Sequence, residues 1–153
     1  MNKTLFGLGG LAATSAVAVF AMTLNAAPVA AQEQVTLYKN PQCSCCEAYA
    51  DYLRENGFEV EVKPTHELAK ISREAGIPDD FQGCHTAFIG DYVVSGHVPI
   101  EVVNRMLEEQ PEIEGITLPG MPMGSPGMGG EKQAPFEIFA IEEGTSPTIY
   151  AVE

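Results

Sequence analysis

Three of the four cysteines in this 153-residue chain, Cys43, Cys45 and Cys46, lie within four consecutive positions. Three soft thiols this close together cannot all be satisfied by packing, so the stretch is a metal site, a redox site or both in turn. A bridge between the adjacent Cys45 and Cys46 would be strained, and a bridge from Cys43 to Cys46 would close a small ring of the reactive kind. The remainder of the chain is therefore interpreted as a scaffold that supplies further ligands to this stretch.

The first thirty or so residues have the pattern of an export signal. Lys3 gives a positive start, residues 5–22 are apolar without an acid, and residues 29–31 are the small residues that a signal peptidase requires. We expect residues 1–31 to be a signal peptide cleaved near Ala31, which places the mature protein in the periplasm without stable membrane insertion. The alternative is an uncleaved anchor, since the apolar run is close to the roughly 18 residues needed to span a bilayer.

The composition is strongly acidic, with 21 Asp and Glu against 8 Lys and Arg and a net charge of −13. Such a chain lacks the basic surface that nucleic acids and anionic membranes require, so neither is expected as a partner. The same charge attracts cations, and metal ions are the expected partners. In an exported protein four cysteines would ordinarily pair into two disulfides, but their spacing here opposes that arrangement.

Short runs of β-branched and aromatic residues alternate with segments of helical periodicity, and together they predict the order β-α-β-α-β-β-α. The strands are expected at residues 35–38, 58–62, 86–89 and 92–95, and the helices at residues 46–56, 66–75 and 100–109. Thr65 is the expected cap of the second helix, and the pair Gly90 and Asp91 indicates a hairpin. This α/β (α+β) order is that of thioredoxin-like folds, with a parallel pair of strands joined by a helix and then an antiparallel hairpin.

The thioredoxin-like metal-binding domain is expected to span residues 34–142. It includes a loop rich in Met, Gly and Pro at residues 118–130, whose composition excludes a core helix or strand. Two strand-like runs at residues 136–141 and 148–152 predict a C-terminal β extension, either a hairpin or an addition to a sheet edge. Residues 143–153 are assigned to this terminal strand and tail.

The expected topology places the cysteine stretch between the first strand and the N-terminus of the first helix. Unpaired N–H groups and the helix dipole stabilise negative charge there, so Cys43 and Cys46 would converge where a thiolate is favoured. A thiolate is both the nucleophile of disulfide exchange and a ligand for soft metals. The spacing alone does not decide between these two roles.

Other soft ligands are expected at the same end of the sheet. Oxidoreductases with this fold carry a cis-proline just before the third strand, where this chain has Cys84 and His85. A thiol and an imidazole suit a metal better than a substrate peptide. His97 follows the hairpin, which could return it to the same end. Met121 and Met123 lie in the loop rich in Gly and Pro, where exposed thioethers are natural ligands for Cu(I).

Four motifs in order, at residues 38–46, 83–86, 96–99 and 115–122, carry a resemblance to a known family. Over residues 34–142 the chain resembles the CopG-type periplasmic copper-binding proteins of domain-of-unknown-function family 411. The resemblance implies a thioredoxin-like fold, a role in copper resistance or homeostasis, and Cu(I) held by cysteine with help from histidine and methionine. Other periplasmic copper-handling proteins are then candidate partners. The implied metal ligands are Cys43, Cys45, Cys46, Cys84, His85, His97, Met121 and Met123.

Two other functions stay open at this point. A thiol-disulfide oxidoreductase acting on protein cysteines would use Cys43 and Cys46, but it leaves Cys45, Cys84 and the methionines without a role. A structural zinc site needs a closed tetrahedral set, which Cys43, Cys46, Cys84 and His85 could supply, although the soft ligands favour copper over zinc. The sequence decides neither which candidate ligands bind together nor whether the protein turns over a substrate. Copper redox activity is a hypothesis that rests on the Cys43 and Cys46 pair.

Overall fold

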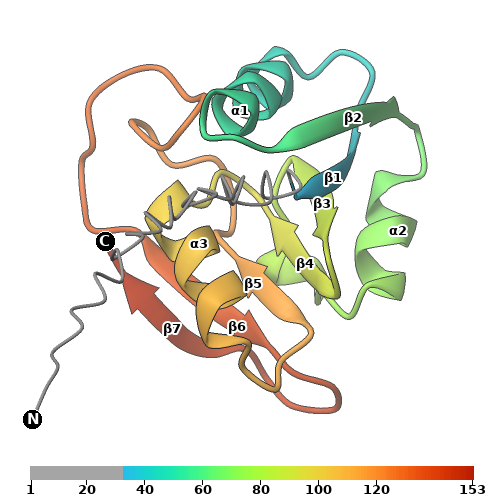
Figure 1. The fold of residues 1–153 in the computed structure, drawn as a ribbon, viewed down its shortest axis with the longest axis vertical. Coiled ribbons are helices and arrows are strands. Elements are labelled where there is room, and N and C mark those ends of the chain that lie inside the picture. The colour runs from blue at the N-terminus through green and yellow to red at the C-terminus, as the bar shows by residue number, and fades with distance from the viewer. Residues whose placement is uncertain (1–32) are drawn as a thin grey trace, which may run out of the picture. The chain divides into compact units, whose positions relative to one another are not determined.

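The computed structural model describes residues 33–153, which Figure 1 shows in colour. The expected signal peptide at residues 1–31 lies outside the described residues. Within residues 33–153, no helix has the length and hydropathy needed to cross a membrane. This part of the chain forms seven strands, three α-helices and one short 3-10 helix.

The elements follow in the order strand, helix, strand, helix, strand, strand, helix and then three further strands. The strands are β1 (Gln34–Lys39), β2 (Glu59–Pro64), β3 (His85–Ile89), β4 (Tyr92–Ser95), β5 (Gly115–Thr117), β6 (Glu137–Ile141) and β7 (Thr148–Val152). The helices are α1 (Ser44–Glu55), α2 (Leu68–Glu74) and α3 (Ile100–Glu109), with the 3-10 helix η1 (Asp79–Phe81) after α2. The predicted β-α-β-α-β-β-α order is therefore confirmed.

All seven strands form one mixed sheet in the order β2-β1-β3-β4-β5-β6-β7. β1 and β2 are parallel and are joined by α1, whereas β3 pairs antiparallel with both β1 and β4. These four strands have the predicted thioredoxin-like arrangement. β5, β6 and β7 continue the sheet beyond β4, so the predicted C-terminal β extension is a hairpin added to the sheet.

The strand β5 is absent from the sequence prediction. It has only three residues, too few to show an alternating pattern, and it forms by pairing parallel with Val93, Val94 and Ser95 of β4. Gly115 permits this close approach, because a Cβ there would collide with the carbonyl oxygen of Val93. Directly after β5, Leu118 donates its N–H to the carbonyl of Ser95, and this fixes where the loop rich in Met, Gly and Pro begins.

Two helices begin at other residues than the sequence predicts. α1 begins two residues before Cys46, because the Sγ of Cys43 accepts the N–H of Cys46 and acts as the N-cap. α2 begins at Leu68, and its N-cap residue Glu67 makes no side-chain capping hydrogen bond. The hydroxyl of Thr65 accepts the N–H of Glu67 instead, so Thr65 shapes the turn before the helix and is not its cap.

The core lies mainly between the sheet and the helices α1 and α3 (Figure 1). Its central side chains are Leu37, Tyr49, Leu53, Met106 and Ile116. A smaller cluster that includes Ile77 packs with the partly buried Phe81 of η1. Helix α1 buries Tyr49, Ala50 and Leu53 in this core, and α3 buries Val102, Val103 and Met106.

One end of the sheet collects segments that are distant in the chain. β1, β4 and β5 end there and β3 begins there, because Lys39 pairs with His85 and Ser95 pairs with Thr117. The segments that leave this end are the cysteine stretch, the loop that carries Cys84, the segment after β4 and the loop at residues 118–130. The topology thus brings the predicted ligand-bearing segments to a common place.

Candidate metal centre

The cysteine stretch forms a tight turn followed by the first turn of α1. The N–H of Cys43 donates to the carbonyl of Asn40 at 3.1 Å, and the Sγ of Cys43 accepts the N–H of Cys46 at 3.3 Å. Cys43 and Cys46 form a disulfide, whereas Cys45 is a free thiol. The N-terminus of α1 therefore carries three sulfurs within one turn, where unpaired N–H groups favour negative charge.

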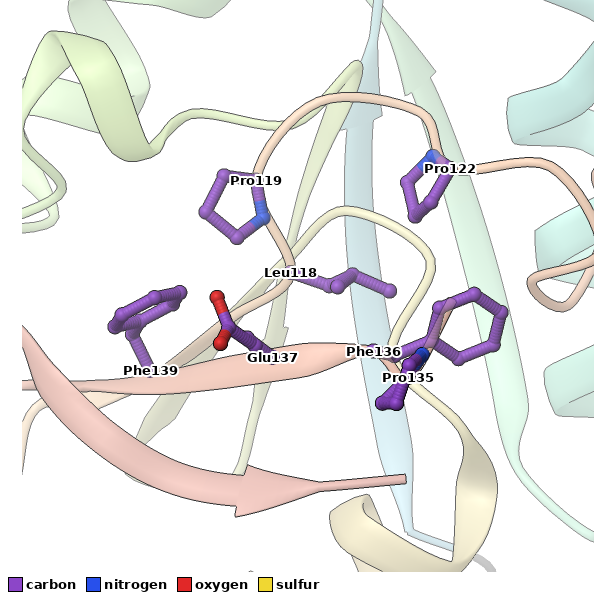
Figure 2. A pocket seen from close by; sticks show the side chains of 7 residues that line it. All are labelled: Leu118, Pro119, Pro122, Pro135, Phe136, Glu137 and Phe139. Atoms are coloured by element: carbon purple, nitrogen blue, oxygen red, sulfur yellow. The ribbon is translucent and has the colours of Figure 1, made fainter. Parts of the chain in front are cut away.

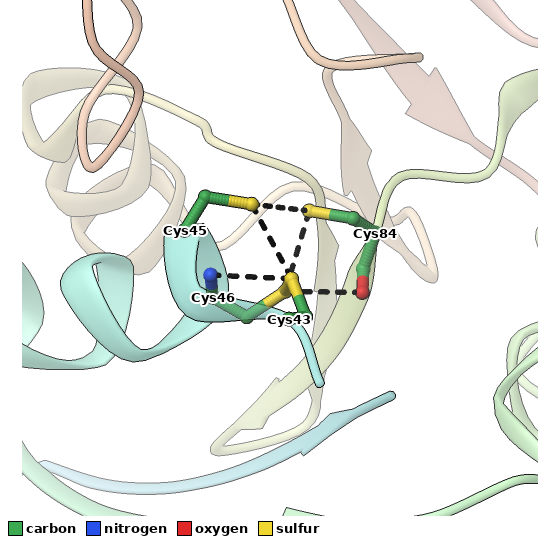
Figure 3. Close-up of side chains that lie close together, drawn as sticks. All are labelled: Cys43, Cys45, Cys46 and Cys84. Carbon is green, nitrogen blue, oxygen red and sulfur yellow. Dashed lines mark hydrogen bonds between the residues drawn. A yellow bond between two sulfur atoms is a disulfide. The ribbon is translucent and has the colours of Figure 1, made fainter. Parts of the chain in front are cut away.

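Cys84 comes from the loop before β3 and completes a group of four sulfurs (Figure 3). The Sγ atoms of Cys43 and Cys45 are 3.3 Å apart, and those of Cys46 and Cys84 are 3.4 Å apart. The Sγ atoms of the two free thiols, Cys45 and Cys84, are 3.9 Å apart. All four ligand atoms lie within 4.8 Å of one another, so a soft ion could contact several of them at once.

Cys84 also belongs to a second group, with His85 and His97. Its Sγ lies 2.9 Å from Nε2 of His97 and 3.6 Å from Nδ1 of His85. The ring of Tyr49 stacks on His85 with centroids 4.5 Å apart, and the two imidazoles meet edge to face at 4.9 Å. Nε2 of His85 is buried without a hydrogen-bond partner, as expected where an ion or another ligand binds.

Burial controls the protonation of this second group. It lowers the pKa of His85 to about 3, with His97 as the second cause, and it also lowers the pKa of His97. Burial and then the neighbouring Cys45 raise the pKa of the Cys84 thiol to about 12. At neutral pH both imidazoles are uncharged, with lone pairs available to a metal, while Cys84 keeps its proton. A metal that binds Cys84 would have to displace that proton.

The loop at residues 118–130, here called the Met-rich loop, contacts this site. The Nδ1–H of His97 donates to the carbonyl of Pro126 at 2.6 Å. This bond opposes the effect of burial on the His97 pKa, and it leaves the lone pair of the ring on Nε2, which faces the Cys84 thiol. Gly127 lies against the first turns of α1, because a Cβ on it would be 2.7 Å from the backbone nitrogen of Tyr49. The loop therefore orients one of the two site histidines.

The sequence analysis missed Lys39 as a site residue. Its side chain is only 2% exposed, and its ammonium group donates to the carbonyls of Asn40, Pro41 and Cys43 at 3.3 Å each. The same group pairs with the carboxylate of Glu47, on the first turn of α1, at 3.0 Å. One buried cation thus holds both the turn that carries the cysteines and the helix that follows it.

Comparisons with known proteins agree with these features. The model of a family described as a protein of unknown function, DUF411, matches residues 81–128, which include Cys84, both site histidines and most of the Met-rich loop. Two solved structures of the copper resistance protein CopG, called form 1 and form 2, are each 27% identical to this chain with a TM-score of 0.74. Each alignment covers 80% of this chain, together with 99% of the form 2 chain and 98% of the form 1 chain. These matches support the resemblance of this chain to the CopG-type proteins of the DUF411 family. No curated protein matches this chain.

The structure brings the four cysteines, His85 and His97 together, and these are six of the eight predicted ligands. The other two, Met121 and Met123, are 56% and 51% exposed on the Met-rich loop. The terminal methyl group of Met123 occupies the space where a Cβ on Gly130 would lie. Whether any of the eight residues binds a metal stays a prediction. Met121 and Met123 could bind an ion only at the surface of the protein.

Substitutions at two glycines of the Met-rich loop test its contact with the site. Gly127 has a φ of +77°, and a Cβ there would press on the backbone of α1, whereas a Cβ on Gly129 would meet open space. We expect Gly127→Ala to push the loop away and to break the hydrogen bond from His97, at a cost of about 1–2 kcal/mol in the free energy of unfolding. Gly129→Ala should cost less than about 0.5 kcal/mol.

The two glycine variants are compared by the ¹⁵N and ¹H NMR signals of the His97 ring and by urea unfolding. A shifted His97 signal in Gly127→Ala alone is the expected result. A His97 signal that is the same in both variants and in the parent protein would show that the Met-rich loop does not hold this imidazole.

Proposed function

We propose that this protein binds copper as Cu(I) through cysteine and histidine side chains and acts in copper resistance or homeostasis. The observation that carries the proposal is the position of Cys84, which belongs both to the four-sulfur group and to the group with His85 and His97. A thiolate at that position could bridge ions held in the two groups. The names of the two similar structures, both of a copper resistance protein, support the choice of metal.

The chemistry of the donor atoms also supports copper. Thiolates and neutral imidazoles suit Cu(I) better than they suit hard ions such as Mg²⁺ or Ca²⁺. The unpaired Nε2 of His85 and the lowered pKa values of both histidines fit a site that takes up a cation other than a proton. Met121 and Met123 are proposed as weaker, exposed ligands that open and close a route for the ion.

The disulfide between Cys43 and Cys46 suggests how copper redox activity would arise. These two sulfurs can act as thiolate ligands only after the disulfide takes up two electrons. In the reverse direction, two Cu(II) ions would each accept one electron, the two thiols would release two protons, and one disulfide and two Cu(I) ions would form. We propose this exchange as the link between the cysteine pair and the oxidation state of copper.

The proposed place of action rests on the sequence alone. A signal peptide at residues 1–31 would direct the protein to the periplasm, and we propose that it exchanges copper there with other copper-handling proteins. The net charge of −13 would raise the local concentration of cations around the site.

A thiol-disulfide oxidoreductase is the second candidate, because the disulfide lies at the N-terminus of α1, as such enzymes require. The side chain of Cys84 counts against it. The Sγ of Cys84 lies 3.4 Å from that of Cys46, and its carbonyl oxygen lies 3.2 Å from the same sulfur. Cys84 and His85 thus stand where oxidoreductases with this fold carry the cis-proline that shapes the peptide-binding groove.

The deciding experiment measures metal content and thiol titre on the mature protein, reduced anaerobically and loaded with Cu(I) against a competing chelator. More than one tightly held copper per chain, with the thiols protected from alkylation, is the expected result. Retention of one inert zinc would favour a structural zinc site. No retained copper, together with reduction of insulin disulfides, would move the protein to the oxidoreductases.

The two groups of ligands predict that substitutions of His97 and of His66 change Cu(I) binding differently. His97 lies 2.9 Å from the Sγ of Cys84, whereas His66 is exposed before α2 and belongs to neither group. We expect His97→Gln to weaken Cu(I) binding by about 10–100-fold and His66→Gln to leave it unchanged, as measured by chelator competition. Equal affinities in the two variants would remove His97 from the ligand set.

A further inference from the structure

The disulfide leaves two thiols free, Cys45 on the first turn of α1 and Cys84 on the loop before β3, and Figure 3 shows their side chains pointing toward each other. Their Sγ atoms are 3.9 Å apart, whereas the sulfurs of a disulfide are about 2.05 Å apart. Both residues are partly exposed, so a small reagent could reach them. Side-chain rotations that bring the sulfurs about 2 Å closer would therefore close a second disulfide.

The loop that carries Cys84 is held on both of its neighbouring segments. The N–H of Gly83 donates to the hydroxyl of Ser95 at 3.0 Å, and Gly83 forms an isolated parallel bridge with Gly120 of the Met-rich loop. Figure 2 shows this part of the Met-rich loop, residues 118–122, beside a cavity of about 230 Å³. These contacts fix the backbone at Cys84, so its sulfur would reach the second thiol by rotation of the side chain.

The closest sulfur to Cys84 is that of Cys46, at 3.4 Å, but Cys46 is already bonded to Cys43. A bridge from Cys46 to Cys84 would leave Cys43 and Cys45 to pair, and these two positions would close a still smaller ring than the existing disulfide does. A bridge from Cys45 to Cys84 keeps the existing disulfide and joins residues 39 positions apart. It therefore avoids the strained bridges within the cysteine stretch.

We infer that Cys45 and Cys84 form a second disulfide and that its closure is the redox step that empties the metal centre. This inference rests on the proposed function, because it concerns the regulation of the same site. With one disulfide closed, as in this structure, two thiols and two imidazoles are available as ligands. Thiolates are the sulfur ligands that metals bind, so the second disulfide would leave the imidazoles without a thiolate partner.

The oxidant that this step requires is a small-molecule disulfide, for example oxidised glutathione. Cys45, at a helix N-terminus where a thiolate is favoured, would attack it, form a mixed disulfide and release one small thiolate. Cys84 would then attack the Sγ of Cys45 and displace the second small thiolate, while Nε2 of His97, 2.9 Å from the Sγ of Cys84, accepts the thiol proton. In total the two cysteines lose two electrons and two protons, and the small disulfide becomes two thiols.

The test equilibrates the metal-free mature protein, with the first disulfide closed, in glutathione buffers of increasing oxidised fraction. The remaining thiols are alkylated and counted by intact mass, and the bridged peptides are identified by tandem mass spectrometry. We expect the count to fall from two thiols to none, with Cys45 joined to Cys84 and no stable glutathione adduct. In the variant Cys84→Ser a glutathione adduct on Cys45 should persist, because the thiol that would displace it is missing.

A double variant isolates the proposed pair. In Cys43→Ser, Cys46→Ser the chain keeps two cysteines, so any disulfide within one chain must join Cys45 to Cys84. We expect this variant to lose both thiols in the oxidising buffers and to stay monomeric. A disulfide-linked dimer, or two stable glutathione adducts, would show that the two sulfurs do not reach each other.

Chelator competition then compares Cu(I) binding by the forms with one and with two disulfides, and we expect the second disulfide to weaken binding by roughly 100-fold or more. Two thiols that stay open to alkylation in the most oxidising buffer, or a bridge from Cys46 to Cys84, would overturn the inference and leave the proposed copper binding untouched. Equal Cu(I) binding by the two forms would show that closure does not empty the site. Failure of the fully reduced protein to bind Cu(I) would overturn the proposed function as well.

Discussion

Replacing Cys84 by serine is expected to weaken Cu(I) binding by roughly 100-fold or more and to lower the number of bound ions. Cys84 is the residue shared by the four-sulfur group and the group with the two histidines, so its loss takes a ligand from both at once. Residues that only orient a metal ligand already contribute about 10–100-fold to affinity. The measurement is chelator competition under anaerobic conditions on the reduced protein, with the ratio of copper to protein determined in parallel.

The matched control is Cys45→Ser, which removes one sulfur from the first group and leaves Cys84, His85 and His97 intact. We expect this variant to keep at least one tightly bound copper ion. Both serine variants should unfold in urea like the parent protein, because Cys45 and Cys84 are partly exposed and form no disulfide. Unchanged affinity and stoichiometry in Cys84→Ser would exclude Cys84 as a ligand.

The parts of the fold that depend on local periodicity could be predicted from the sequence. Helix α3 has the predicted bounds, because an apolar face recurs at helical spacing between Pro99, which precedes it, and Gln110, which ends it in the left-handed region. Strand β5 could not be predicted in this way. Its three residues become a strand only because Gly115 lets the chain approach Val93 of a strand some twenty positions earlier.

That the cysteines, His85 and His97 lie close together could also be predicted, since the topology brings their segments to one end of the sheet. The detailed geometry could not. The sequence allowed several pairings of the cysteines, and the disulfide joins Cys43 to Cys46, the small ring of the reactive kind. The hydrogen bond from His97 to Pro126 depends on the path of a long loop, and the sequence of this loop has no periodic pattern from which its path could be predicted.

Lys39 shows what a closer reading of the pattern could have found. Val35 and Leu37 are buried on β1, and Lys39 continues the same alternation toward the core. A charged residue at an inward position needs partners, because an unpaired buried charge is strongly unfavourable. The sequence therefore contained a signal for a buried cation beside the cysteines, although the carbonyls that it contacts depend on the turn that follows.

Replacing Lys39 by methionine is expected to destabilise the protein by about 2–3 kcal/mol and to weaken copper binding with it. Methionine keeps an unbranched apolar side chain but lacks the ammonium group, which donates to three carbonyls and pairs with the carboxylate of Glu47. A hydrogen bond to a charged donor contributes about 1.5–3 kcal/mol to the free energy of unfolding. The carbonyls around Cys43 that lose the ammonium group can replace only part of these hydrogen bonds with water. Urea unfolding and Cu(I) competition on the same preparations measure the two effects.

Lys63 provides the matched control for Lys39. Its ion pair with Glu61 has the same length of 3.0 Å, but its side chain is 41% exposed, so water screens the pair and replaces its hydrogen bonds. Lys63→Met should therefore leave stability and copper affinity unchanged, and Lys39→Arg, which keeps the charge and the donors, should recover part of what Lys39→Met loses. If Lys39→Met unfolds and binds copper like Lys63→Met, the buried cation does not hold the cysteine turn, and the helix N-terminus alone must position the thiols.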